Sequence, residues 1–190
     1  MLDPSVDRTF AHEYEVAQLT ELPPGPSTVP VVYLPMNRTH NTDGVMVEIS
    51  PNSAEPWIGV FAFGYGLART AISAISTCPD EYSICVVANG SAYVTDSRRP
   101  SSCVTVPCVP VFGVRSVARA DLLVFWDFTS IVAWGRQGLA WKSSDLCSDD
   151  LEIEEVTGKS IKCTGWSAPS RSKIAFELDL FTGTTTVLRA

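Results

Sequence analysis

The sequence lacks most of the patterns from which a reaction can be inferred. It contains no Cys-x-x-Cys pair, and its two histidines are His12 and His40, so a structural zinc site is not expected. It contains no Gly-x-Ser-x-Gly segment, the turn that presents the nucleophile in many hydrolases. The glycines of Phe61–Gly66 are not followed by a helical pattern that would cradle a phosphate. We therefore predict no catalytic residue, no metal ligand and no cofactor, and favour a binding protein over an enzyme.

Basic residues are scarce in the chain. Lys and Arg number 14 against 21 Asp and Glu, which gives a formal net charge of −7. Binding to nucleic acid or to an anionic membrane needs a concentrated basic surface, so neither partner is expected. An acidic chain is compatible with a basic protein partner, or with no charged partner at all.

A secretory signal is also lacking, because residues 1–18 have no basic start followed by an apolar run. No apolar run approaches the length needed to cross a bilayer. We expect a soluble cytoplasmic protein, in which the glycosylation-type triplets at Asn37 and Asn89 are chance matches. The six cysteines are then expected to be small, partly buried residues and not a disulfide framework.

Helical periodicity is rare, and the chain after Val29 consists of short runs rich in Val, Ile, Thr and aromatic residues. These runs repeat. Ile75, Val114 and Ile153 follow one another at intervals of 39 residues, and the following apolar runs keep nearly the same interval. Each regular unit reads as four short strands, and Asn89-Gly90 is a strong hairpin signal between the second and third strands of its unit.

The repeat predicts one all-β domain over residues 1–190. An irregular first unit covers residues 12–66, and regular units cover residues 72–106, 111–145 and 149–190. Four units of about four strands predict a small β-propeller-like repeat architecture. A β-sandwich or a barrel of consecutive hairpins is the alternative, since such meanders produce the same local pattern. The apolar character of both faces of the second strands favours stacked sheets.

The stretch Asp121–Trp141 contains three of the five tryptophans, and Trp126, Asp127 and Trp134 suggest a ligand cage. In register with the preceding unit, the stretch is instead the middle hairpin of the third unit. Asp127 then occupies a turn position, and the tryptophans fill the space between adjacent sheets.

The segments "LLVFWDFTSIVAWGRQGLAW" and "IAFELDLFTG" resemble blades of quinoprotein-like and WD-like propellers, in which a hairpin ends in Gly followed by Trp. The resemblance covers roughly residues 111–185 and lacks the Gly-His and Trp-Asp dipeptides of WD repeats. The fuller pattern, with "PWIGVFAFGYG", also looks like a set of bacterial proteins of unknown function. Neither resemblance implies catalytic residues, because propellers include enzymes, lectins and scaffolds.

Two long polar loops, Pro35–Gly44 in the first unit and Gly165–Lys173 in the last, are the candidate site. In a closed ring the first and last units are neighbours, so these loops would meet beside the link Phe63–Thr70. The mixture of aromatic, basic and amide groups suits a polar or anionic ligand, or an acidic protein patch; ordinary solvated loops are the alternative. The candidate residues are Asn37, Arg38, His40, Asn41, Asp43, Tyr65, Arg69, Trp166, Arg171 and Lys173.

Two groups of titratable residues could take part in catalysis or in binding of a metal ion. His40 with Asp43 could form a general base with an orienting carboxylate, but Asp43-Gly44 equally fits a turn, which we favour. In the run Asp149–Glu155, alternation places Asp150, Glu152 and Glu154 on one face. That face could bind a divalent cation, but a solvated strand face is the favoured interpretation.

Taken together, these features predict a non-catalytic protein-interaction or binding module, such as an acidic inhibitor of a basic protein. The alternative is a receptor for a small polar or anionic ligand, or an enzyme, that uses the loops around residues 35–44 and 165–173.

Overall fold

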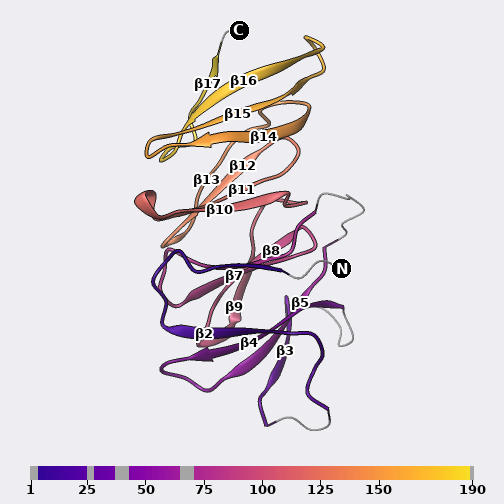
Figure 1. Ribbon diagram of the computed structural model, residues 1–190, viewed down its shortest axis with the longest axis vertical. Helices are drawn as coiled ribbons and strands as arrows, with labels where there is room; N and C mark the ends of the chain where they lie inside the picture. Colours follow the sequence, from indigo (N-terminus) through magenta and orange to yellow (C-terminus); the bar gives the residue numbers. More distant parts are fainter. Residues whose placement is uncertain (1–3, 25–27, 37–42, 65–70, 189–190) are drawn as a thin grey trace.

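Short β-branched and aromatic runs, separated by turn-forming residues, form four β-sheets stacked one above another in the computed structural model (Figure 1). The structure describes residues 4–24, 28–36, 43–64 and 71–188. Within these residues the only helical element is a short 3-10 turn, η1 (Ala118–Ala120). No helix in the described part of the chain has the length and apolar character needed to cross a membrane.

The third and fourth sheets are simple antiparallel meanders, in which strands follow one another in sequence order. The third sheet consists of β10 (Gly113–Val117), β11 (Leu122–Trp126), β12 (Ile131–Gly135) and β13 (Gly138–Lys142). The fourth consists of β14 (Asp149–Val156), β15 (Ser160–Ser167), β16 (Ser172–Asp179) and β17 (Thr185–Leu188).

The first two sheets contain strands that come from outside the meander. The second consists of β6 (Ala74–Thr77), β7 (Ser83–Ala88), β8 (Ser91–Asp96) and β9 (Arg99–Thr105), and β1 (Ser5–Asp7) pairs in parallel with β6. In the first sheet the order is β2 (Tyr14–Leu19), β4 (Gly44–Pro51), β5 (Trp57–Ala62) and β3 (Val31–Leu34). Strand β3 thus lies at the far edge, parallel to β5.

Three apolar cores hold the stack together, one between each pair of successive sheets. Val86, Phe125 and Cys163 occupy equivalent positions on the second strands of the three regular sheets, and each packs in the core against the preceding sheet. The residues that precede them, Cys85 and Val124, pack against the following sheet. The 39-residue period therefore corresponds to one sheet of the stack.

The predicted all-β architecture of four sheets is confirmed, with four or five strands in each sheet. The ends of the predicted strands differ by a few residues at most from the ends in the structure. Asn89 and Gly90 have positive φ of 45° and 83°, as a tight hairpin turn between β7 and β8 requires. The sequence did not predict β1, nor the position of β3 at the far edge.

The four sheets follow one another in a line, and the first and fourth sheets lie at opposite ends of the stack (Figure 1). Each of the three cores joins neighbours in the chain: first to second, second to third and third to fourth. The arrangement in which the first and last units become neighbours in a ring is therefore not found among the described residues.

The tryptophans of the Asp121–Trp141 stretch pack on the apolar cores between adjacent sheets, as predicted. Trp134 packs on the core between the second and third sheets, and Trp126 on the core between the third and fourth. The carboxylate of Asp127 accepts hydrogen bonds from the backbone N–H groups of Thr129 and Ser130, at 2.9 and 2.7 Å. It closes the turn between β11 and β12 and is not part of a ligand cage.

Candidate functional site

The predicted site residues that the structure describes divide into two groups. Asp43 lies directly before β4 in the first sheet, and its carbonyl oxygen accepts a hydrogen bond from the backbone N–H of Phe63. Trp166, Arg171 and Lys173 lie on or beside the β15–β16 hairpin of the fourth sheet. The other predicted residues lie outside the described part of the chain: Asn37, Arg38, His40, Asn41, Tyr65 and Arg69.

The described residues of the two predicted loops do not lie close to one another. The second and third sheets lie between Asp43 and Trp166, because the stack is linear (Figure 1). Met36 and Asp43 border one loop in the first sheet, whereas the other loop belongs to the fourth sheet. The expectation that polar groups of both loops lie at one place is thus corrected for the described residues. Trp166, Arg171 and Lys173 form a separate candidate surface.

The fourth sheet has an outward face that no other sheet of the described residues covers. Lys162 and Thr164 occupy the positions at which β7 carries Cys85 and Val87, which pack against the following sheet. The prediction that this second strand is apolar on both faces is therefore wrong. A charged and polar outer face is what the terminal repeat of a stack requires in water.

Trp166 lies among charged residues on this outward face. It is opposite Asp149 on one neighbouring strand and opposite Lys173 on the other. Its side chain remains 43% exposed. The Nζ atom of Lys173 lies 2.7 Å from Oε2 of Glu152, and this hydrogen bond raises the pKa of Lys173. Arg171, in the left-handed region with φ of 50°, forms the turn that begins β16.

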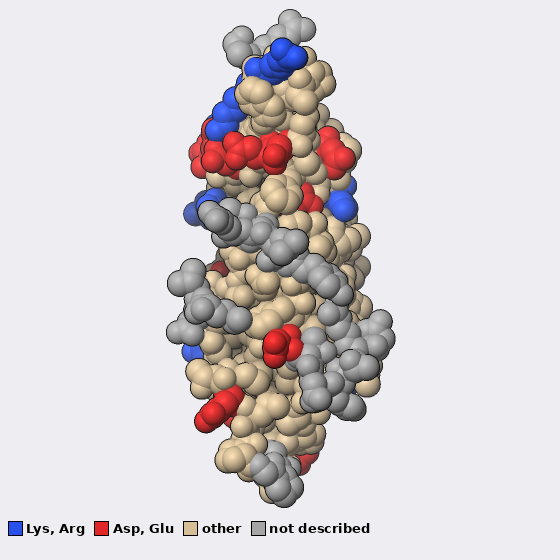
Figure 2. Space-filling model, turned by 90° about the vertical axis from the view of Figure 1, so that its right-hand side faces the viewer, with Lys and Arg blue, Asp and Glu red and all other residues tan. Residues whose placement is uncertain are grey.

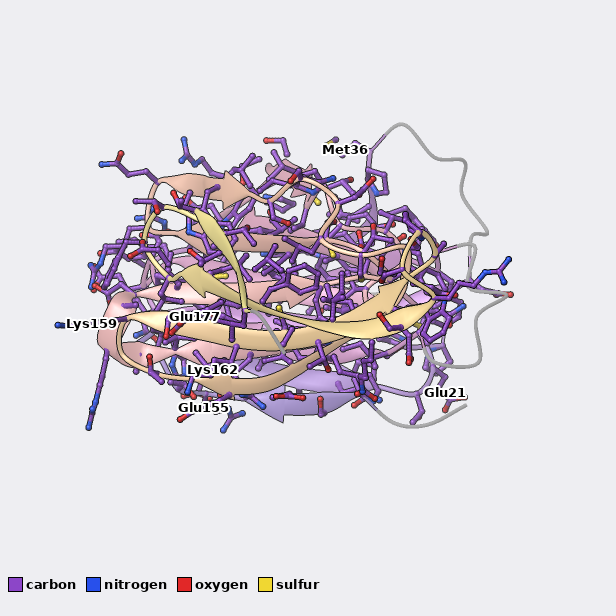
Figure 3. All side chains as sticks on the ribbon, turned by 90° about the horizontal axis from the view of Figure 1, so that it is seen from above. Glu21, Met36, Glu155, Lys159, Lys162 and Glu177 are labelled. Atoms are coloured by element: carbon purple, nitrogen blue, oxygen red, sulfur yellow. The ribbon has the colours of Figure 1, made fainter. Side chains whose placement is uncertain are left out.

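A second row of charges crosses the same face, as Figure 3 shows from above. Lys162 is opposite Glu155 on β14 and opposite Glu177 on β16. Its Nζ atom lies 2.8 Å from Oε2 of Glu155, and this hydrogen bond raises the pKa of Lys162. All three side chains are solvated, so the pair organises the surface more than it stabilises the fold.

Strand β14 departs from the regular alternation that the sequence predicted. Irregularities after Asp149 and after Ile153 shift its register against β15. As a result Asp149, Glu152 and Glu155 are opposite outward residues of β15, in place of the predicted face formed by Asp150, Glu152 and Glu154. The described residues contain no group of three or more His, Cys, Asp or Glu side chains suited to hold a metal ion.

Acidic side chains outnumber basic ones around this surface. Figure 2 shows a band of Asp and Glu across the upper part of the stack, with Lys and Arg above it. The Glu152 and Glu155 carboxylates have lysine partners. Among the described residues, Asp149, Asp150 and Glu154 form no ion pair. The surface therefore combines an exposed indole with three carboxylates that form no ion pair among the described residues, although Asp150 and Glu154 also interact with the charge of Lys173.

All six cysteines are free thiols, and their environments suppress ionisation. Burial raises the pKa of Cys103 to about 11 and that of Cys163 to about 12. Burial also raises the pKa of Cys78 well above its usual range. Since the thiolate is the reactive form, these groups are poor nucleophiles near neutral pH.

A cleft that the sequence did not predict opens between the second and third sheets, with a volume of about 280 Å³. It lies between the β8–β9 hairpin and the β12–β13 hairpin, and Trp134 contributes to its wall. The local pattern gave no signal for it, because it arises from two turns that are about 40 residues apart and that meet only through sheet stacking.

A scan against protein-family models and a search of the curated proteins found no match to the chain.

Proposed function

We propose that the chain is a protein-interaction module that binds a basic partner protein through the outward face of its fourth sheet. The observation that carries the proposal is the environment of Trp166. A large indole stays 43% exposed between Asp149 and Lys173, at the end of a stack whose other described tryptophans are more buried. Exposed tryptophans are frequent anchors of protein interfaces, where a partner buries their apolar area.

Charge complementarity defines the partner. Asp149, Asp150 and Glu154 form no ion pair among the described residues, and Lys173, the cation whose charge acts on Asp150 and Glu154, is already paired with Glu152. A partner with Lys or Arg beside an apolar recess would pair with these carboxylates and cover the indole. Opposite charges on two surfaces also steer encounter and raise the association rate. The formal net charge of −7 acts in the same direction.

Binding, and not catalysis, fits the chemistry of the described residues. Burial keeps the thiols of Cys78 and Cys163 protonated, which makes them weak nucleophiles. The charged groups of the fourth sheet are solvated, and they lie on an open face instead of in an enclosed site. The predicted cytoplasmic location and the likeness to bacterial proteins of unknown function belong to the same proposal.

The test is capture of the partner from a lysate of the native host on the immobilised chain. Trp166→Ala removes the anchor, and Phe181→Ala is the matched control, because Phe181 is an aromatic residue in the β16–β17 turn that is even more exposed, at 56%. We expect one basic protein to bind the wild-type chain and Phe181→Ala, and to be lost with Trp166→Ala. Binding should weaken as salt is added, because the contact is partly electrostatic.

Two outcomes would refute the proposal. One is a captured protein that Trp166→Ala retains at the wild-type level. The other is an acidic captured protein that is indifferent to changing Asp149, Asp150 and Glu154 to Asn, Asn and Gln. Circular dichroism of each variant shows whether the sheets remain folded.

A further inference from the structure

The cleft between the second and third sheets has features of a small-molecule site that are independent of the proposed docking face. It is formed by the β6–β7 turn and the β8–β9 hairpin of one sheet, and by the β12–β13 hairpin of the next. Its volume of about 280 Å³ is at the lower limit for ligand pockets, which suits a ligand the size of an amino acid.

Part of the lining of this cleft is apolar. Val94 is 5% exposed, and Trp134 is partly buried against the core between the two sheets. Val104, on β9, is 47% exposed and brings a further aliphatic side chain to the lining. Cys78 also belongs to the lining, and burial raises the pKa of its thiol, so it is neutral. An apolar side chain of a ligand could therefore be covered by this part of the lining without burying a charged group.

Two arginines line the cleft, one from each sheet. Arg99 donates to Oδ2 of Asp96 through Nε and Nη2, at 3.3 and 3.1 Å, and its side chain is 72% exposed. Arg136 donates through Nε to Oδ2 of Asp121 at 3.3 Å, and its side chain is 65% exposed. A guanidinium has five N–H donors, so both arginines retain donors for a carboxylate.

The two carboxylates of the cleft differ in their availability. Asp96 accepts hydrogen bonds from both Arg98 and Arg99, on both of its oxygens, and has no capacity left for a ligand. Asp80 accepts the hydroxyl of Ser83 on Oδ2 at 2.6 Å. Among the described residues no ion pair involves Asp80. It is therefore the acceptor that the cleft offers to a cationic group.

We propose that this cleft binds a small zwitterion of amino-acid size that carries an apolar or aromatic side chain. The ammonium group pairs with Asp80, the carboxylate is held by Arg99 and Arg136, and the side chain packs on Val104 and Trp134. Asp80, Asp96, Arg99 and Arg136 carry a formal charge of zero together, which matches a ligand whose own charges cancel.

Isothermal titration with L-phenylalanine and two blocked forms tests the proposal directly. Phenylalaninamide keeps the ammonium group and lacks the carboxylate, whereas N-acetylphenylalanine keeps the carboxylate and lacks the ammonium group. We expect phenylalanine to bind saturably. Each blocked form should bind at least about tenfold more weakly than phenylalanine, because each loses one charge-assisted contact.

Variants locate the binding. Asp80→Asn keeps an acceptor for Ser83 and removes the charge, and Arg136→Gln removes the guanidinium; each should weaken phenylalanine binding about tenfold. The matched controls are Glu81→Gln, in the same turn, and Arg115→Gln, on β10 of the same sheet; neither residue lines the cleft.

The proposal is overturned if phenylalanine shows no saturable binding, or if one blocked form binds as well as the zwitterion. It is also overturned if Glu81→Gln and Arg115→Gln weaken binding as much as the cleft variants do. Trp166→Ala, which tests the proposed docking face, should leave phenylalanine binding unchanged, so the two proposals fail separately.

Discussion

The indole Nε1 of Trp141 donates a hydrogen bond to the carbonyl oxygen of Leu180 at 2.9 Å, and so ties the third sheet to the turn after β16 in the fourth. The same kind of contact joins the first sheet to the second. Nε1 of Trp57 donates to the carbonyl oxygen of Ser97, in the turn after β8, at 2.5 Å. The partners are 39 and 40 residues apart, so the period of the sequence reappears as a repeated connection between sheets.

We expect Trp141→Phe to destabilise the chain by about 1–3 kcal/mol, because Phe preserves most of the buried ring and leaves the Leu180 carbonyl without its donor. The measurement is the free energy of unfolding from urea titration followed by circular dichroism. Trp166→Phe changes an indole at an exposed site and is the control. Equal destabilisation by both variants would show that the hydrogen bond to Leu180 contributes nothing specific.

Gly113→Ala should destabilise the third sheet. Gly113 is opposite Trp126 across β10 and β11, and a Cβ atom at position 113 would overlap the six-membered part of the indole ring. Displacing a packed indole typically costs about 1–3 kcal/mol. Gly158→Ala is the matched control, because a Cβ atom there meets no other group within 4 Å. A difference below about 0.5 kcal/mol between the two variants in urea titration would contradict the expected overlap.

The pH dependence of stability should reflect Asp96. Hydrogen bonds from Arg98 hold the pKa of this carboxyl below its ordinary value of 3.8 in the folded chain. The unfolded chain therefore takes up the proton first as the pH falls. The stabilisation by Asp96 is present at neutral pH, and is lost as the pH falls through 3.8 toward the lower folded pKa.

Asp96→Asn should accordingly be less stable than the wild type at pH 7, and the difference should shrink as the pH falls below about 4. Thermal unfolding at a series of pH values measures this. Glu81→Gln, which removes a carboxylate that forms no ion pair among the described residues, controls for net charge. A constant difference between Asp96→Asn and wild type across this pH range would refute the assignment.

Thiol labelling should follow burial. Cys85 is inaccessible, and Cys103 and Cys147 are partly exposed. Because burial raises the pKa of Cys103 to about 11 and also raises that of Cys147, even these two should react slowly with iodoacetamide at pH 8. Mass spectrometry of peptides labelled before and after unfolding gives the site. Rapid native labelling of Cys85 would contradict the packing of β7.

The sequence predicted the local structure well, because the features that define a strand are local. Apolar runs at Ile84, Leu122 and Ile161 locate the second strands, and the positive-φ pair at Asn89-Gly90 locates a turn. Strand β1 was missed because it is short and acquires its pairing only from β6, far along the chain. Non-local pairing of this kind leaves no periodic trace in the residues that undergo it.

The candidate site was harder to predict, because the period of a repeat states how many sheets there are and not whether they close into a ring. One signal was available. Lys162 stands where Cys85 and Val124 pack toward the next sheet, and a lysine at that position marks the sheet that has no successor. The cleft depends on side chains from two sheets, such as Arg99 and Arg136, whose proximity follows only from the stacking.

The linear order of the sheets also determines how the molecule should come apart. Among the described residues, an inner sheet is held by two apolar cores, whereas the fourth sheet is held by one, the core around Ile161 and Phe176. In arrays where each unit touches only its neighbours, stability is close to a sum of unit and interface contributions, so terminal units fray first. Backbone amides of β15 and β16 should then exchange with solvent by a local opening that leaves β7 and β11 protected. The surface proposed to bind a partner thus belongs to a terminal sheet, which should open more readily than the inner sheets. Binding of the partner should stabilise this sheet against local opening.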